Sequence, residues 1–188
     1  KQPLLKRKLK SYSKKDFQFM KNLKDKDLPF LFDKKFLSLV DVIQAVLEVQ
    51  HELGRSVVTK RSKEIGYNVL DSNLAYGYYY GFCDAVIVAS KFREGLVELF
   101  YLWVNIVHRF TKVGNDPREF VDYFSLIQTK FIHDKKSQFY KGCISGGQDA
   151  MDWMGNSSQT IMGLITLLEK TKKIKDKKYP IKYWITCT

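Results

Sequence analysis

The chain has 188 residues, of which 45% are hydrophobic and 14% aromatic, enough to bury the core of one domain and too much for a disordered protein. Its four prolines and eleven glycines are too few for a sandwich or barrel of many short strands, and no apolar run reaches the length of a membrane span. The net charge of +12 comes from the two ends: residues 1–35 hold 12 Lys/Arg against 4 Asp/Glu, residues 170–188 hold 7 against 1, and the middle is nearly neutral. The sequence therefore predicts a soluble globular protein with basic ends. Its compartment stays open, and a removed signal or transit peptide is compatible with it.

In chain order, helix-start residues and 3.6-residue periodicity predict helices along most of the chain. A short helix starts after Ser13, and a long one starts after Asp33 and stops at Gly54. After the loop VGNDP, Pro117 occupies the first position of a later helix. The predicted helices span residues 13–26, 33–53, 56–71, 72–90, 94–112, 117–132, 137–154 and 158–173.

These elements predict an all-α fold: apart from the short N-terminal helix 13–26, they form a compact bundle of about 6–7 helices. We divide the chain into three parts by charge and periodicity. Residues 1–32 form a basic N-terminal segment with a short helix, residues 33–173 form the helical domain, and residues 174–188 form a basic and aromatic tail.

Two segments match at a constant offset of 65 residues: SNLAYGYYYGFCDA begins at Ser72 and SQFYKGCISGGQDA begins at Ser137. Each has a serine that can cap a helix, followed by the pattern GxxxGxxDA. We interpret the match as an internally duplicated helical hairpin, covering about residues 72–112 and 137–173. The paired positions are Gly77 with Gly142, Gly81 with Gly146, Asp84 with Asp149, and Ala85 with Ala150.

Residues four apart lie on one helix face, so Gly77, Gly81 and Ala85 form a smooth stripe. Each glycine costs about 1 kcal/mol of helix stability relative to alanine, and close approach of another helix is the usual reason to accept that cost. We therefore predict that the two glycine stripes face each other at a structural helix crossing. Asp84 and Asp149 are expected to bind nearby backbone or basic groups and keep the crossing in register; a carboxylate pair acting on a metal ion or as acid and base is the alternative.

The nine residues GYYYGFCDA, Gly77 to Ala85, resemble a GYxxGxxDA helix seen in small helical periplasmic immunity proteins of type VI secretion. The resemblance implies a protein that binds and blocks a toxin enzyme and performs no catalysis itself.

Basic and aromatic side chains are the candidate contact residues. Basic ends on a neutral body indicate contact with a polyanion such as RNA, DNA or acidic lipid, and a solubilising role for the charge is the alternative. In the tail, lysines alternate with aromatic residues, which suits single-stranded nucleic acid, a membrane surface or an acidic protein groove. The candidate polyanion-binding residues are Lys6, Arg7, Lys8, Lys10, Lys172, Lys173, Lys175, Lys177 and Lys178, and the candidate partner surface is Tyr78, Tyr79, Tyr183 and Trp184.

The sequence offers no motif for catalysis, metal binding or a cofactor. Cys83, Cys143 and Cys187 form no CxxC pair; Cys83 and Cys143 are expected as free thiols, with a bridge between them as the alternative. None of the three histidines has zinc-site spacing, and GxxxxGK[ST], GxGxxG and GxSxG are absent. We therefore predict no catalytic residue, no metal, no cofactor and no small-molecule substrate.

The sequence favours a non-enzymatic interaction protein, a subunit or adaptor that acts through its basic ends and exposed aromatics. Another protein is the expected partner. One alternative is a nucleic-acid-binding component of a ribonucleoprotein-type assembly, which would bind oligonucleotides in a salt-sensitive way. Another is the inhibitor of a toxin enzyme that the resemblance implies, and an enzyme using Asp84 and Asp149 ranks below these. A monomer with internal pseudo-symmetry and a homodimer both fit the pattern.

Overall fold

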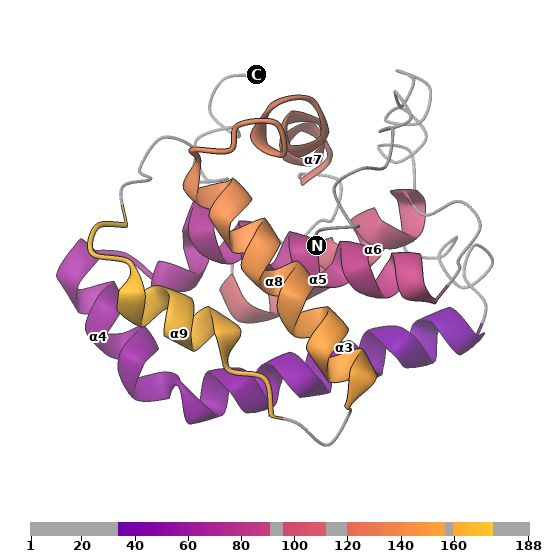
Figure 1. The fold of residues 1–188 in the computed structure, drawn as a ribbon, viewed down its shortest axis with the longest axis horizontal. Helices are drawn as coiled ribbons and strands as arrows, with labels where there is room; N and C mark the ends of the chain where they lie inside the picture. Colours follow the sequence, from indigo (N-terminus) through magenta and orange to yellow (C-terminus); the bar gives the residue numbers. More distant parts are fainter. Residues whose placement is uncertain (1–33, 91–95, 112–119, 157–159, 175–188) are drawn as a thin grey trace.

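The computed structural model describes residues 34–90, 96–111, 120–156 and 160–174, and the elements it shows there are all helical (Figure 1). The predicted all-α bundle is confirmed. The α-helices are α3 (Lys34–Leu53), α4 (Arg55–Ile65), α5 (Asn73–Ala89), α6 (Leu96–Thr111), α7 (Val121–Leu126), α8 (Gln138–Gly155) and α9 (Gly163–Lys170). A 3-10 helix spans Val69–Asp71, and a π-helical turn spans Ile127–Phe131.

Several predictions fall outside the described residues. They are the short helix 13–26, the start of the helix at Pro117, and the binding candidates Lys6, Arg7, Lys8, Lys10, Lys175, Lys177, Lys178, Tyr183 and Trp184. Among the described residues, no helix combines the length and the apolar character that crossing a membrane requires.

Helices α5 and α8 begin where the sequence predicts, because each has a serine cap. The Ser72 hydroxyl accepts a hydrogen bond from the amide of Ala75 at 3.3 Å, and the Ser137 hydroxyl accepts one from Tyr140 at 3.0 Å. These bonds satisfy amides that the first helical turn leaves without a backbone partner.

Three predicted helices differ from the structure. The segment 56–71 is α4 and a separate 3-10 helix, because Gly66 adopts a left-handed φ of 77° and ends α4. The described part of 117–132 changes from α7 to a π-helical turn at Ile127, and periodicity does not distinguish these two windings. Within the described part of the predicted helix 158–173, only α9 is helical, and side chains from other helices cap its start at Gly163, as described below.

Helices α5 and α8 cross with their backbones in contact, and α8 lies in front of α5 in Figure 1. A Cβ atom added to Gly77 would lie 2.0 Å from the carbonyl oxygen of Phe139, and one added to Gly81 would lie 1.9 Å from that of Cys143. Real Cβ atoms essentially never come within 3.0 Å of such atoms. The crossing therefore requires glycine at both positions of α5.

The same contacts occur from the opposite helix. A Cβ added to Gly142 would lie 2.1 Å from the carbonyl oxygen of Leu74, and one added to Gly146 would lie 1.9 Å from that of Tyr78. Leu74 precedes Phe139, and Tyr78 precedes Cys143, by the same 65 residues that separate the paired glycines. Each contact that a glycine of α5 makes with α8 therefore has a counterpart made by a glycine of α8 with α5, as around a local twofold axis. Both helices contribute equally to the close packing.

Helix α5 is buried on nearly all sides, since α6 and α8 both pack against it. Its tyrosines lie inside the core: Tyr76 packs edge-on against Trp103 with ring centroids 6.2 Å apart, and Trp103 stacks on Tyr123 at 5.9 Å. Tyr78 and Tyr79 are 0% exposed, so the prediction that they form a partner surface is wrong. Their hydroxyls find partners inside the protein, which allows the whole side chain to be buried.

We expect Gly66→Ala to destabilise the protein by about 1 kcal/mol, because an L side chain is strained at the left-handed φ of Gly66 although nothing lies within 4 Å of the added Cβ. Gly155→Ala is the matched control, since its Cβ also meets open space and its φ is not positive. Urea denaturation of both variants measures the difference. Equal stability of the two variants would contradict a conformational role for Gly66.

Candidate anion-binding pocket

Asp149 belongs to a hydrogen-bonded network that links α5, α8, α9 and α3. Its Oδ2 atom accepts from the hydroxyl of Tyr78 at 2.5 Å and from the amide of Gly163 at 2.8 Å. Gln50 of α3 donates to the Tyr78 hydroxyl at 3.0 Å and accepts from the amide of Leu164 at 2.9 Å. Asp149 and Gln50 thus cap α9 from two other helices. The sequence predicts that Asp149 binds a backbone or basic group that keeps the crossing in register; in the structure its backbone partner belongs to α9, and its bond to Tyr78 joins α8 to α5.

Asp84 and Asp149 have different neighbours. The pKa of Asp149 is raised above its ordinary value of 3.8, chiefly by burial, although its bonds to Tyr78 and Gly163 favour the charged form. Asp84 lies close enough to Cys143 to affect its thiol: burial, and secondly the charge of Asp84, raises the pKa of Cys143 to about 12. Cys83 and Cys143 are both free thiols. Burial, and secondly the Asp84 charge, also raises the pKa of Cys83 well above its ordinary value.

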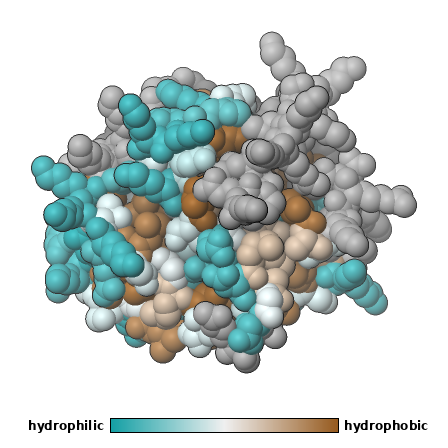
Figure 2. Space-filling view, in the orientation of Figure 1, coloured by the Kyte–Doolittle hydropathy of each residue, from teal (hydrophilic) through white to brown (hydrophobic). Residues whose placement is uncertain are grey.

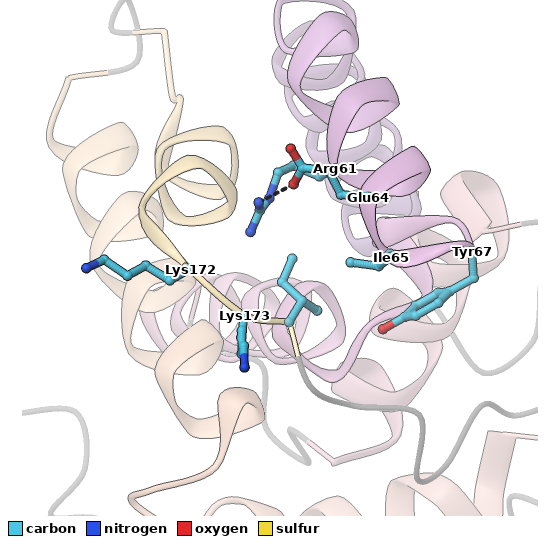
Figure 3. A pocket seen from close by; sticks show the side chains of 7 residues that line it. Arg61, Glu64, Ile65, Tyr67, Lys172 and Lys173 are labelled. Atoms are coloured by element: carbon cyan, nitrogen blue, oxygen red, sulfur yellow. Dashed lines mark hydrogen bonds and ion pairs between the residues drawn. The ribbon is translucent and has the colours of Figure 1, made fainter.

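A cavity lies where the C-terminal end of α4 meets the chain that follows α9 (Figure 3). It encloses about 320 Å³. Three cationic side chains, one carboxylate, one tyrosine and two isoleucines form its walls. They are Arg61, Lys172, Lys173, Glu64, Tyr67, Ile65 and Ile174.

Arg61 is the inner cation of this pocket, with only 14% of its side chain exposed. Its Nη1 atom pairs with Glu64, and its Nη2 atom donates to the carbonyl oxygen of Thr171. Its Nε atom is buried without a hydrogen-bond partner among the described residues. Figure 3 shows the guanidinium pointing into the space between α4 and residues 172–173, with the side chains of the exposed Lys172 and Lys173 extending away from it. Arg61 is therefore held in place as a preorganised hydrogen-bond donor.

The turn after α4 positions Tyr67. Gly66 ends α4 by donating its amide to the carbonyl oxygen of Ser62, and the Ser62 hydroxyl accepts from the amide of Val69. This closed turn places the ring of Tyr67 on the wall opposite Lys172 (Figure 3). The segment on the other side of the pocket, residues 172–174, is also held by a hydrogen bond, because the Gln138 side chain donates to the carbonyl oxygen of Lys173 at 2.6 Å. Both walls of the pocket are thus built from hydrogen-bonded backbone.

The surroundings of the pocket are basic. Helix α4 carries four basic residues and one acidic residue, and Lys170, Lys172 and Lys173 follow at the end of α9 with only Glu169 beside them. Figure 2 shows that the edge of the molecule where α4 lies is largely hydrophilic. We call the surface formed by these cationic side chains the basic end of the folded domain, as distinct from the two basic ends of the sequence. It consists of Lys60, Arg61, Lys63, Lys170, Lys172 and Lys173. Charge counting along the sequence missed the contribution of α4, because it lies within a nearly neutral middle.

A second, more open groove lies between α3 and α6 and encloses about 780 Å³. Its charges are balanced, because Arg109 pairs with Glu48 across the groove and Glu52 pairs with Arg55. His51 lines it and is hydrogen-bonded through Nε2 to the hydroxyl of Tyr79 at 2.9 Å. The described residues contain no group of three or more His, Cys, Asp or Glu side chains that could hold a metal ion. This groove has less excess charge to attract a ligand than the basic end.

His51 is expected to make stability depend on pH. Burial lowers its pKa from 6.5 to about 4, so the folded state favours the neutral ring. This contribution to stability is complete above pH 6.5 and is lost as the pH falls toward 4. Between pH 7 and 5 we expect the wild type to lose up to about 2 kcal/mol more than His51→Gln, measured by urea denaturation. His133→Gln, at an exposed position, is the control for the loss of a histidine elsewhere in the chain.

Among the predicted site residues, the structure brings together the four glycines and buries Ala85 and Ala150 beside the crossing. It places Lys172 and Lys173 on the rim of the pocket. Sequence reasoning missed Arg61 and Tyr67. The only sequence signal was the run KRSKEIGY, in which basic residues precede a helix-ending glycine and an aromatic residue.

No protein-family model, no curated protein and no solved structure matches this chain.

Proposed function

We propose that this protein is a non-enzymatic interaction protein, a subunit or adaptor that binds an anionic macromolecule through its basic end. The observation that carries the proposal is the convergence of α4 with the chain after α9, which gathers six cationic side chains from two distant parts of the sequence. Clustered cations raise the local concentration of polyanions and speed their association.

The position of Asp149 supports binding over catalysis. Its Oδ2 atom accepts hydrogen bonds from Tyr78 and Gly163. Gly163 lies directly against the Asp149 carboxylate, since a Cβ atom added to Gly163 would lie 2.0 Å from Oδ2. A general base needs hydrogen-bond access to its substrate. The carboxylate of Asp149 therefore caps α9.

The reciprocal contacts at the α5–α8 crossing support our interpretation of residues 72–112 and 137–173 as an internal duplication. Under this interpretation the crossing is the stable frame that holds α9 and the basic end in place.

The nine residues that resemble immunity proteins are packed inside the molecule, all but Asp84 being fully buried. They are a helix-packing motif in this fold and present no contact surface. For the role of toxin inhibitor, which the resemblance implies, the basic end is the surface that would meet an acidic enzyme.

The test is binding of the full chain to three polyanions, an oligonucleotide, an acidic peptide and anionic vesicles, at low and near-physiological salt. We expect binding to at least one of them that weakens steeply as salt rises. Replacing Lys60, Lys63 and Lys170 with glutamine should weaken it at least tenfold. The matched control replaces Lys130, Lys135 and Lys136, which are also exposed, so the same charge is removed elsewhere. Equal losses in the two triple variants, or no binding to any polyanion, would overturn the proposal.

A further inference from the structure

We propose that the pocket between α4 and residues 172–174 holds one nucleotide of a single-stranded nucleic acid, with its phosphate on Arg61 and its base against Tyr67. This inference rests on the proposed function, because it names the anionic macromolecule and the subsite that selects it.

The pocket has the charge and the donors for a phosphate. Arg61, Lys172 and Lys173 line the pocket together with a single carboxylate, that of Glu64, so the lining carries an excess of positive charge. Arg61 is already fixed by Thr171 and Glu64, so it loses little conformational freedom when it binds an anion. The two exposed lysines can approach a strand from the rim, as point charges that need no fixed geometry.

The pocket also has an apolar side that a bare phosphate does not need. Tyr67, Ile65 and Ile174 line it next to the cations, and Figure 3 shows the Tyr67 ring beside Ile65. A cavity of about 320 Å³ lies at the lower end of the range for small-molecule sites, which suits one base with its sugar and phosphate. Cations beside an aromatic ring are the arrangement by which proteins bind single strands, through phosphate contact and base stacking.

The combination favours a single strand over the other phosphate sources. In a duplex the bases are stacked on one another, so only phosphates would reach the pocket and Tyr67 would contribute nothing. A lipid headgroup brings phosphate without a planar base, and inorganic phosphate lacks both base and strand. The contribution of Tyr67 therefore distinguishes the proposal from general attraction to anions.

The experiment measures binding of the full chain to a labelled random single-stranded oligonucleotide, its duplex, inorganic phosphate, an acidic peptide, and vesicles containing phosphatidylserine. We expect Tyr67→Leu to weaken single-strand binding about fivefold or more and to leave duplex and vesicle binding within about twofold. Tyr67→Phe keeps the ring and should bind like the wild type. Lys173→Met should weaken binding more than Lys63→Met, which removes the same charge from an exposed position of α4 outside the pocket. Circular dichroism and melting temperature confirm that each variant is folded.

Each outcome separates this inference from the function on which it rests. If Tyr67→Leu and Lys173→Met lose no more single-strand binding than Lys63→Met, the pocket is not a nucleotide subsite, and a general basic surface remains. If vesicles bind more tightly than oligonucleotides and compete with them, the phosphate source is a membrane and the inference is overturned. If the wild type binds only the acidic peptide, the inference fails while the proposed function stands. If it binds no polyanion, both fail.

Discussion

Gly81→Ala is expected to destabilise the protein by more than about 3 kcal/mol, although alanine is the better helix former by about 1 kcal/mol. The added methyl group would lie 1.9 Å from the carbonyl oxygen of Cys143 and 2.8 Å from its Cα atom. Both are backbone atoms, so α5 and α8 must separate along the crossing and lose packing over its whole length. For a chain of this size we expect the melting temperature to fall by roughly 6–12 °C, measured by calorimetry.

Gly147→Ala is the matched control, because Gly147, on α8, is a buried glycine within a helix as Gly81 is on α5. Its added Cβ would meet only the carbonyl oxygen of Gly81, at an ordinary 3.6 Å. We expect this variant to be as stable as the wild type or up to about 1 kcal/mol more stable. Gly146→Ala should repeat the loss of Gly81→Ala, and the double variant should lose less than the sum, since both open the same crossing. A wild-type melting temperature for Gly81→Ala would show that the helices do not meet as described.

Asp149→Ala is expected to destabilise the protein by about 2–4 kcal/mol. It removes the acceptor of the Gly163 amide and that of the Tyr78 hydroxyl, and because Tyr78 is buried, water does not readily replace the acceptor there. Since α9 is only eight residues long, it depends on this cap and on Gln50 for its start. Hydrogen exchange at α9 should accelerate in the variant, and urea denaturation gives the change in the free energy of unfolding.

Asp149→Asn separates the hydrogen bonds from the charge. Its amide oxygen can accept from the same two donors, so we expect a loss below about 1 kcal/mol near neutral pH. Because the pKa of Asp149 is raised in the folded state, folding binds its proton more tightly, and this group's contribution to stability falls as the pH rises above about 4. The stability of the wild type relative to Asp149→Asn should therefore decrease over that range. If the stability of the wild type relative to Asp149→Asn instead increased with pH, the hydrogen bonds would lower the pKa of Asp149 by more than burial raises it.

Local signals in the sequence determined the helical class, the caps of two helices and the glycine crossing. Ser72 and Ser137 act on amides three residues away, so their effect can be predicted without the fold. The stripe of Gly77 and Gly81 predicts a close helix crossing from the sequence alone, because glycine in a helix is unfavourable unless another backbone needs the space. The constant offset of 65 residues then indicated which helix would occupy that space.

Only the tertiary structure decided where polar and basic groups came to lie. The tyrosines of α5 look like a contact surface in sequence, yet Gln50 and Asp149 supply partners that allow Tyr78 to be buried. Helix α9 is shorter than its periodicity predicts, because its cap comes from those same distant side chains. Arg61 and Lys173 are more than a hundred residues apart, and only packing of α4 against α9 unites them. Caps and helix faces act within a few residues of sequence, whereas burial and charge clustering depend on which helices pack together.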